Sequence, residues 1–412
     1  MNVAARWAAG WGVASLRLET ILRCKERVEP RAKPSGRAAR RAAPVWLTLV
    51  AAVGLSGCTT ASYYWQSASG HLSLLQAARP VADWLQDDAT PAPLRERLAL
   101  AQRIRAFASS ALHLPDNASY RRYADLKRRA AVWSVTAAPP DSLTLKTWCY
   151  PVIGCAGYRG YYDERAANAL AAQLAAADGL ETSVLAVPAY STLGWLNWLG
   201  GDPLLSTFIH YPVGELARMV FHELAHQVVY VADDTAFNES FATAVERLGV
   251  TEWLAREAGE AARRDYAAFD ARRQAFRVLT ADTRRELDAI YKQKRAQVGE
   301  QSAWLATKSE AMARFRQRYE ALKAQWAAEG RPFSGYDGWV ARANNASFGV
   351  QAAYNELVPG FEALFAQQGG DWPRFHAAVR ELSTLPLAER QARLRALAAA
   401  SKPDTTSAGA AR

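Results

Sequence analysis

Histidine and long apolar runs are both scarce in this chain. Only six of its 412 residues are histidine, so any cluster of histidines is informative. After residue 57 no segment is apolar enough to span a membrane as a helix, which takes ~20 consecutive apolar residues. Internal repeats and long low-complexity linkers are missing too. The roughly 355 residues after position 57 are therefore expected to form one large or two modest domains with a substantial core.

The charge excess of the chain is concentrated at its N-terminus. The formal net charge is +10, but residues 1–57 alone hold ten Lys or Arg residues and three acidic residues. The remainder holds 40 basic and 37 acidic residues, which is nearly balanced. This balance removes the support that a high isoelectric point would give to nucleic-acid binding, and no nucleic-acid partner is expected.

Residues 1–57 have the parts of a secretion signal. A basic region precedes the apolar stretch 45–55, and the small residues Ser56 and Gly57 follow it; the apolar core is too short for a stable membrane anchor. The ending LSGC resembles the bacterial lipoprotein lipobox, which implies lipidation of Cys58 and attachment to a membrane surface. Because Thr59 rather than aspartate follows, the resemblance implies the outer membrane, facing the periplasm. The alternative is a chance apolar run.

Cysteine is rare beyond this leader. Cys149 and Cys155 have five residues between them, and in an oxidising compartment they are expected to form a local disulfide. Half of a second metal site is the alternative, but no neighbouring histidine completes it.

The segment 221–249, FHELAHQVVYVADDTAFNESFATAVERLG, carries the chemistry. Apolar residues recur around it with helical spacing, and in a helix His222 and His226 project from one face because they are four residues apart. Glu223 lies between them, where its carboxylate can take a proton from water activated by a metal ion. The alternative is an accidental helix with two surface histidines.

The run NESFATAVE, residues 238–246, follows this helix. It resembles the second zinc helix of gluzincin peptidases, most closely the aminopeptidase N-like family, which implies that Glu239 is the third ligand of one Zn²⁺ ion; two His and one Glu form a common catalytic zinc site. Glu246 lies two turns further along the same face. Only twelve residues separate His226 from Glu239, fewer than in that family, so we expect a tighter loop. Asp233 and Asp234 in this loop could orient a ligand histidine.

The flanking sequence predicts a mixed fold. Helical patterns occupy residues 63–130, and a further alanine-rich helix is expected at 163–177. Strand-prone segments, which should form a small mixed sheet, lie at 131–136, 147–152, 158–162 and 182–187. An edge strand that holds the substrate backbone is placed at 189–195, although an ordinary strand and turn would read the same. Residues 250–329 read as a charged helical hairpin that breaks near 280–283 and whose charge is mostly solvated; a coiled coil for a partner is the alternative.

Four segments carry a wider resemblance. They are WCYPVIGCAGYRGYYDE, PAYSTLGWLNWLGGDPLLSTF, FHELAHQVVYVADDTAFNESFA and NNASFGVQAAYNELVPGF. Together they resemble the motifs of a family of proteobacterial lipoproteins described as predicted aminopeptidases. The resemblance extends over nearly all of the chain after residue 58 and implies a zinc site and a peptide substrate.

Amide hydrolysis also needs a donor for the oxyanion that forms. Tyr354 is our candidate, although a buried phenol is equally common, and His210 is second. Asn344 and Asn345 are possible contacts for the substrate backbone. An aminopeptidase further needs a carboxylate for the substrate ammonium, and three residues are conceivable: Glu181, Asp202 and Glu356.

Taken together, the sequence predicts a mostly helical α+β fold: a zincin-like metallopeptidase with a small mixed sheet, an HExxH helix and a long helical hairpin. We expect a leader at 1–57, a helical part with the catalytic core at 58–249, a helical region completing the cleft at 250–401, and a disordered tail at 402–412. The expected function is a lipid-anchored periplasmic zinc aminopeptidase. The alternatives are a zinc endopeptidase and a non-catalytic zinc-containing scaffold.

Overall fold

A computed structural model describes residues 62–150, 154–189, 191–296 and 301–401, without the side chains of 294–303 and 352–354. The predicted leader, the lipidation site Cys58 and the tail lie outside these residues. None of the described helices combines the length and the apolar character needed to cross a membrane.

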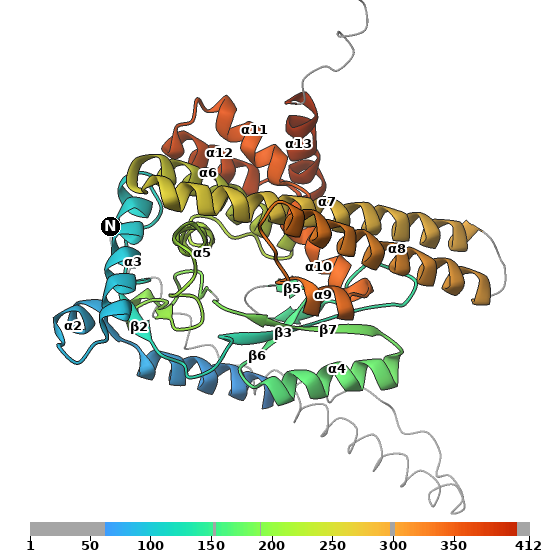
Figure 1. Ribbon diagram of the computed structural model, residues 1–412, viewed down its shortest axis with the longest axis horizontal. Coiled ribbons are helices and arrows are strands. Elements are labelled where there is room, and N and C mark those ends of the chain that lie inside the picture. Colours follow the sequence, from blue (N-terminus) through green and yellow to red (C-terminus); the bar gives the residue numbers. More distant parts are fainter. Residues whose placement is uncertain (1–61, 151–153, 190, 297–300, 402–412) are drawn as a thin grey trace, which may run out of the picture. The chain divides into compact units, whose positions relative to one another are not determined.

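The strands of the described residues form three small sheets (Figure 1). The first joins β1 (Arg79–Pro80), β2 (Arg122–Ala124) and β8 (Leu204–Leu205), and β2 pairs antiparallel with β1 and parallel with β8. The second has the order β6 (Arg159–Tyr161), β3 (Val132–Ala138) and β7 (Glu181–Val187), antiparallel throughout. The third is a hairpin of β4 (Trp148–Tyr150) and β5 (Gly154–Ala156). The four predicted strands are thus present, but they are divided between two of these sheets.

Helix α4 (Glu164–Asp178) covers one face of the β6–β3–β7 sheet. It begins at Asp163, whose side chain accepts a hydrogen bond from the Ala166 amide, and ends at Gly179 in the left-handed conformation; these are the usual start and stop of a helix. Helix α10 (Asn345–Asn355) also contacts β3 and β7, and Figure 1 shows it on the side of the sheet away from α4.

Two helices form the centre of the larger core. They are α5 (Val213–Ala225), seen end-on in Figure 1, and α6 (Thr235–Glu257), which pack against each other. Phe221 and Phe241 are fully buried there, and burying such a side chain stabilises the fold by ~1.5–3 kcal/mol. Further helices among the described residues are α2 (Val81–Gln86), α3 (Ala92–Ser110), α9 (Asp337–Arg342), α11 (Val358–Gln367), α12 (Trp372–Ser383) and α13 (Leu387–Ala400), and residues 62–77 are helical too.

A helical hairpin of α7 (Glu260–Ala296) and α8 (Gln301–Ala328) follows. The predicted break near 280–283 is wrong, because α7 is continuous: the hydroxyls of Thr280 and Thr283 donate to Phe276 O and Leu279 O one turn back, a bond that a helix accommodates. The hairpin has its own core, which includes Phe276, Tyr291 and Phe315.

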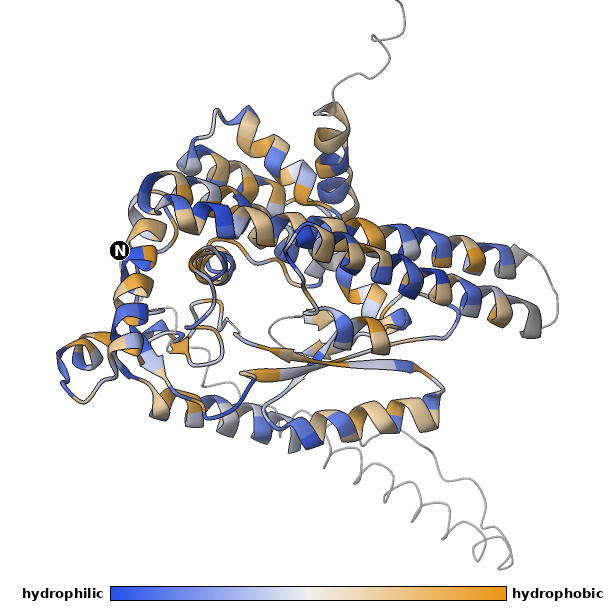
Figure 2. Ribbon diagram, in the orientation of Figure 1, coloured by the Kyte–Doolittle hydropathy of each residue, from blue (hydrophilic) through white to orange (hydrophobic). Residues whose placement is uncertain are grey.

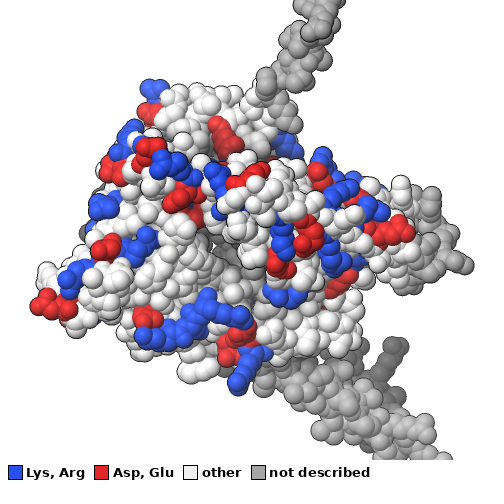
Figure 3. All heavy atoms as spheres, viewed as in Figure 1, with Lys and Arg blue, Asp and Glu red and all other residues white. Residues whose placement is uncertain are grey.

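Among the described residues, hydrophilic residues are mixed with hydrophobic ones, and basic side chains with acidic ones. Hydrophilic and hydrophobic residues share α7 and α8 along their length (Figure 2). On the face displayed in Figure 3, basic and acidic side chains are interspersed, in line with the nearly balanced charge after residue 57.

The segment 189–195 is not the predicted edge strand. Its described residues form a turn in which Leu193 and Gly194 have positive φ angles of 57° and 75°. Asp202 fixes this turn by accepting a hydrogen bond from the Thr192 amide at 3.0 Å. β7 is an edge strand of its sheet, because it pairs with β3 on one side, and its end at Val187 lines a cavity together with residues of α5.

Candidate metal centre

The HELAH segment places two imidazoles side by side at the end of α5. His222 lies in the last turn and His226 follows as the C-terminal cap, still in the right-handed helical conformation. Their Nε2 atoms are 3.2 Å apart. The spacing of four residues thus brings both side chains to one point, as the sequence predicted.

Glu239 on α6 completes this cluster. Its Oε2 lies 3.4 Å from His222 Nε2 and 3.7 Å from His226 Nε2, and the three residues form one group of potential metal ligands. Atoms that share one tetrahedral ion at bond lengths of ~2.0–2.2 Å lie roughly 3.3–3.6 Å from each other. The cluster therefore has the dimensions of a single-ion site.

The protonation of the two histidines also suits a metal. Burial lowers the pKa of His222 to about 3 and that of His226 to about 4, so both rings are neutral at physiological pH and each can offer a lone pair. Two neutral rings and a carboxylate are borderline ligands of the kind that zinc and related ions take. The residues present fit such an ion.

The residue that orients His222 is Glu246. Its Oε2 lies 3.1 Å from His222 Nδ1, and its other oxygen accepts a hydrogen bond from Arg218. A carboxylate behind a ligand histidine fixes the ring and its tautomer. Glu246 follows Glu239 by seven positions, about two helical turns, so both face α5. The sequence shows this spacing of Glu246, but it predicted that Asp233 or Asp234 orients the ligand histidine.

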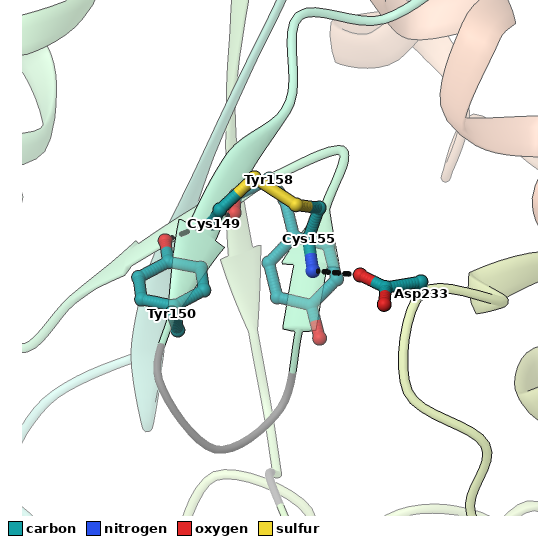
Figure 4. The surroundings of a disulfide bond; sticks show 5 residues. All are labelled: Cys149, Tyr150, Cys155, Tyr158 and Asp233. Atoms are coloured by element: carbon teal, nitrogen blue, oxygen red, sulfur yellow. Dashed lines mark hydrogen bonds between the residues drawn. A yellow bond between two sulfur atoms is a disulfide. The ribbon is translucent and has the colours of Figure 1, made fainter.

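The prediction that Asp233 and Asp234 orient a ligand histidine is wrong. Asp233 accepts a hydrogen bond from the Cys155 amide at 2.6 Å (Figure 4). Asp234 is the N-cap of α6 and forms a buried ion pair with Arg390 of α13 at 2.8 Å. Both carboxylates therefore hold the loop between α5 and α6 in place and make no contact with the histidines in the described structure.

The tight loop before Glu239 is closed by Asn238. Its side chain accepts a hydrogen bond from Val231 N and donates one to Val231 O, each at 2.8 Å. An amide that pairs with both backbone groups of one residue holds the loop against the first turn of α6. The loop thus reaches Glu239 within the twelve residues available.

The disulfide Cys149–Cys155 is present and links β4 to β5 (Figure 4). Gly154 beside it has a φ of 74°, and a Cβ there would lie 2.5 Å from Asp233 Oδ1. Only glycine therefore lets the hairpin approach the loop of the metal centre this closely.

Glu223 lies beside the ligand cluster without belonging to it. Its side chain is buried, and burial, followed by the charges of Glu239 and Asp202, holds its pKa well above the usual range. A bound cation opposes these effects because positive charge favours the carboxylate. Glu223 therefore has the environment of a group that exchanges protons.

A cavity of about 280 Å³ opens beside these residues. This volume is at the lower end of the ~300–1,000 Å³ typical of small-molecule pockets, so it suits a short part of a peptide. The cavity is lined from α5, α6, α7, the end of α10 and the end of β7, by Val187, Pro188, Ala189, Tyr211, Glu215, Arg218, Met219, His222, Glu223, Thr243, Glu246, Arg277 and Asn355.

Several other predicted site residues serve the fold instead. Asn345 is fully buried and donates to Pro139 O and Ser142 O, while Asn344 donates to Thr182 O, so the predicted contact with substrate backbone is wrong for both. His210 is exposed and lines a different cavity. Tyr354 lies in α10, but its side chain is outside the described residues.

None of the three proposed ammonium-binding carboxylates lines the cavity. Glu181 accepts hydrogen bonds from Lys308 and from the Asn345 amide. Glu356 pairs with Arg395 at 2.9 Å, and Asp202 is buried and accepts a hydrogen bond from Thr192 of the turn at 189–195. Besides Glu223, two acidic residues line it, Glu215 and Glu246, and both are paired with arginine.

The family model described as "Putative aminopeptidase" matches residues 62–394. No curated protein and no solved structure matches the chain. The matched range contains the three candidate ligands, Glu223 and both helical cores. The predicted aminopeptidase resemblance is confirmed at the level of the family, while the lipoprotein assignment stays a prediction. Because the match covers most of its length, this chain belongs to that aminopeptidase family.

Proposed function

We propose that this chain is a zinc aminopeptidase of the gluzincin type. The observation that carries the proposal is the convergence of His222, His226 and Glu239 within one group of ligand atoms, with Glu223 beside it in a cavity. Three protein ligands leave a position open, as catalytic zinc sites do, whereas structural sites are usually closed by four. A catalytic role is therefore favoured over a scaffold.

The residues of the site would have separate roles in the reaction. His222, His226 and Glu239 would hold the ion, and Glu246 keeps the His222 ring in one orientation. When bound, zinc lowers the pKa of water and polarises a carbonyl. Glu223 accepts the proton that the attacking water loses and delivers it to the leaving amine.

The substrate would lie along the cavity next to β7. The end of this strand, Val187, lines the cavity together with Pro188 and Ala189. An edge strand can bind an extended peptide through its backbone groups. Tyr354 remains our candidate donor to the oxyanion. Tyr230 is a second phenol near the centre, because Glu239 contributes, after burial, to the raised pKa of its hydroxyl.

We also propose that the protein is a lipoprotein of the bacterial outer membrane, facing the periplasm, attached through Cys58. This rests on the basic region, the apolar stretch and the LSGC ending in the sequence. Labelling of cells with a radioactive fatty acid tests it: wild-type protein is expected to carry the label and Cys58→Ala is expected to lose it. An unlabelled wild-type protein would contradict the anchor.

An endopeptidase is the second candidate. The observation in its favour is that the carboxylates Glu215 and Glu246 in the cavity are already paired with arginine. An endopeptidase needs no carboxylate for a substrate ammonium.

Two peptides that differ only in N-terminal acetylation decide between these functions. The purified, zinc-loaded protein is incubated with each, with and without a chelator, and the products are read by mass spectrometry. Stepwise loss of residues from the free peptide alone, abolished by the chelator, is the expected result. Internal cuts in both peptides would establish an endopeptidase, and no cutting of either would overturn the proposal.

A further inference from the structure

We infer that Arg277 of α7 binds a substrate carboxylate in the cavity beside the metal centre, so that the enzyme prefers short peptides bearing a negative charge near the scissile bond. The inference rests on the proposed peptidase function and names a substrate class for it. The charge can come from an acidic side chain or from the C-terminus of a very short peptide, and the two are separable by experiment.

Arg277 lies near three other arginines, of which Arg218 also lines the cavity, and each of these three has a carboxylate partner. Arg218 pairs with Glu215 at 3.1 Å and also with Glu246. Arg273 pairs with Glu215 and with Asp270, the latter at 2.9 Å. A further pair, from α6 to α11, joins Arg247 to Glu362 at 3.3 Å.

Arg277 is the exception. Within the described part of the chain its guanidinium makes no hydrogen bond and no ion pair. It is nevertheless partly buried and lines the same cavity as His222 and Glu223. A desolvated arginine without a carboxylate is unusual, because the charge loses hydration and gains nothing in return.

The electrostatic surroundings of Arg277 favour an anion. Burial first, and then the positive charges of Arg247, Arg218 and Arg273, lower its pKa to about 9, while Asp270 opposes this. The guanidinium thus stays protonated at neutral pH in surroundings that disfavour its charge. A carboxylate entering the cavity would relieve that cost, and a guanidinium can bind it through two parallel hydrogen bonds.

The position of Arg277 makes this charge relevant to catalysis. Glu223 and Arg277 line one cavity of about 280 Å³, which limits the substrate between them to a short length. The bound carboxylate therefore belongs to a residue close to the reacting carbonyl. A distant acidic residue in a long peptide would gain little.

The test compares Arg277→Gln with Arg285→Gln, a matched charge removal on the same helix, where Arg285 is 79% exposed. Substrates are alanine peptides of two to four residues, each as the free acid and as the C-terminal amide. A second set consists of tetrapeptide amides with Glu or Gln at each position. Cleavage is measured as kcat/KM. Binding is measured by calorimetry in zinc-loaded Glu223→Gln protein, with and without Arg277→Gln.

Wild-type protein should favour the charged member of a pair, and Arg277→Gln should reduce that preference by roughly 10- to 100-fold. Arg285→Gln should leave it unchanged. A preference confined to free acids identifies the C-terminal carboxylate, and one confined to Glu over Gln identifies an acidic side chain. Equal losses on charged and neutral peptides would overturn the inference, as would a wild-type protein without preference.

The two proposals fail in different ways. Chelator-sensitive cleavage without an Arg277-dependent preference, in turnover or in binding, removes the carboxylate site and leaves the peptidase. Arg277-dependent binding without any cleavage removes the peptidase and leaves the binding site.

Discussion

The helix pair α5–α6 and the hairpin α7–α8 contribute to one cavity in different ways. The helix pair carries the three candidate ligands, with Glu223 beside them and Glu246 behind His222; the two histidines are four positions apart and the two α6 glutamates seven. The hairpin carries no such motif, and its arginines resembled solvated surface in the sequence. Yet Arg273 is only 11% exposed and Arg277 lines the cavity. Site residues that are regularly spaced within one helix can be recognised in the sequence, whereas a residue that reaches the site through contact between distant helices cannot.

A glycine makes the contact between the two regions possible. A Cβ on Gly214 of α5 would lie 2.3 Å from Tyr266 Cδ2 of α7. Any other residue would displace the Tyr266 side chain, because real Cβ atoms do not approach this closely. Further along α7, Arg277 lines the cavity.

The largest effect is expected from Glu223→Gln, which changes the helix pair α5–α6 and not the hairpin α7–α8. Removing the proton acceptor should lower kcat by about 10²–10⁴-fold, while the three ligands remain. Metal content, measured by atomic absorption, should stay near that of wild type. Loss of zinc in this variant would mean that Glu223 holds the ion and that the roles are misassigned.

The next largest effect is expected on stability, at the start of α6. Asp234→Ala removes a helix cap and leaves Arg390 buried without its carboxylate, which should cost about 3–5 kcal/mol in urea denaturation. Asp371→Ala is the matched control, because Asp371 caps α12 in the same way but is exposed; about 1 kcal/mol is expected there. Similar losses in both variants would show that the buried ion pair contributes little.

Glu246→Gln tests the orientation of His222. A weakened partner of a ligand histidine should lower zinc affinity by about 10- to 100-fold, measured by competition with a chelator. Glu257→Gln, at the exposed end of the same helix, should bind zinc like wild type. Unchanged affinity in Glu246→Gln would leave the ring fixed by its packing alone.

The dependence of stability on pH should come from the larger core and not from the hairpin. Residues 260–340, which include the hairpin, contain no histidine. Burial lowers the pKa of His376 on α12 from 6.5 to about 4. Between these values the unfolded state binds more protons, so stability falls as the pH drops below 6.5. In metal-free protein, His376→Phe should reduce the loss of unfolding free energy between pH 7 and pH 5 by roughly 2 kcal/mol. An unchanged loss would contradict the buried neutral state.

The smallest effect is expected from a surface pair of the hairpin. Arg314 of α8 donates to Glu286 of α7 at 2.6 Å, and both are partly exposed. Glu286→Gln should cost at most ~1 kcal/mol and leave kcat/KM unchanged. A large loss of activity would show that the packing of the whole hairpin, and not Arg277 alone, maintains the cavity.

The sequence by itself determined the parts that local periodicity encodes. The HELAH helix follows from apolar recurrence, and the pairing of its histidines follows from their spacing of four. The strands at 132–138 and 181–187 and the helix at 164–178 were also predicted within two residues of their observed ends.

Only the tertiary structure decided which side chains meet across elements. It assigned Glu246 rather than Asp233 or Asp234 to His222, made a turn of the segment predicted as an edge strand, and brought the end of β7 and Arg277 to the cavity. It also turned Asn345 into a buried structural residue. These outcomes depend on how helices and strands pack, and packing joins residues whose separation along the chain carries no regular signal.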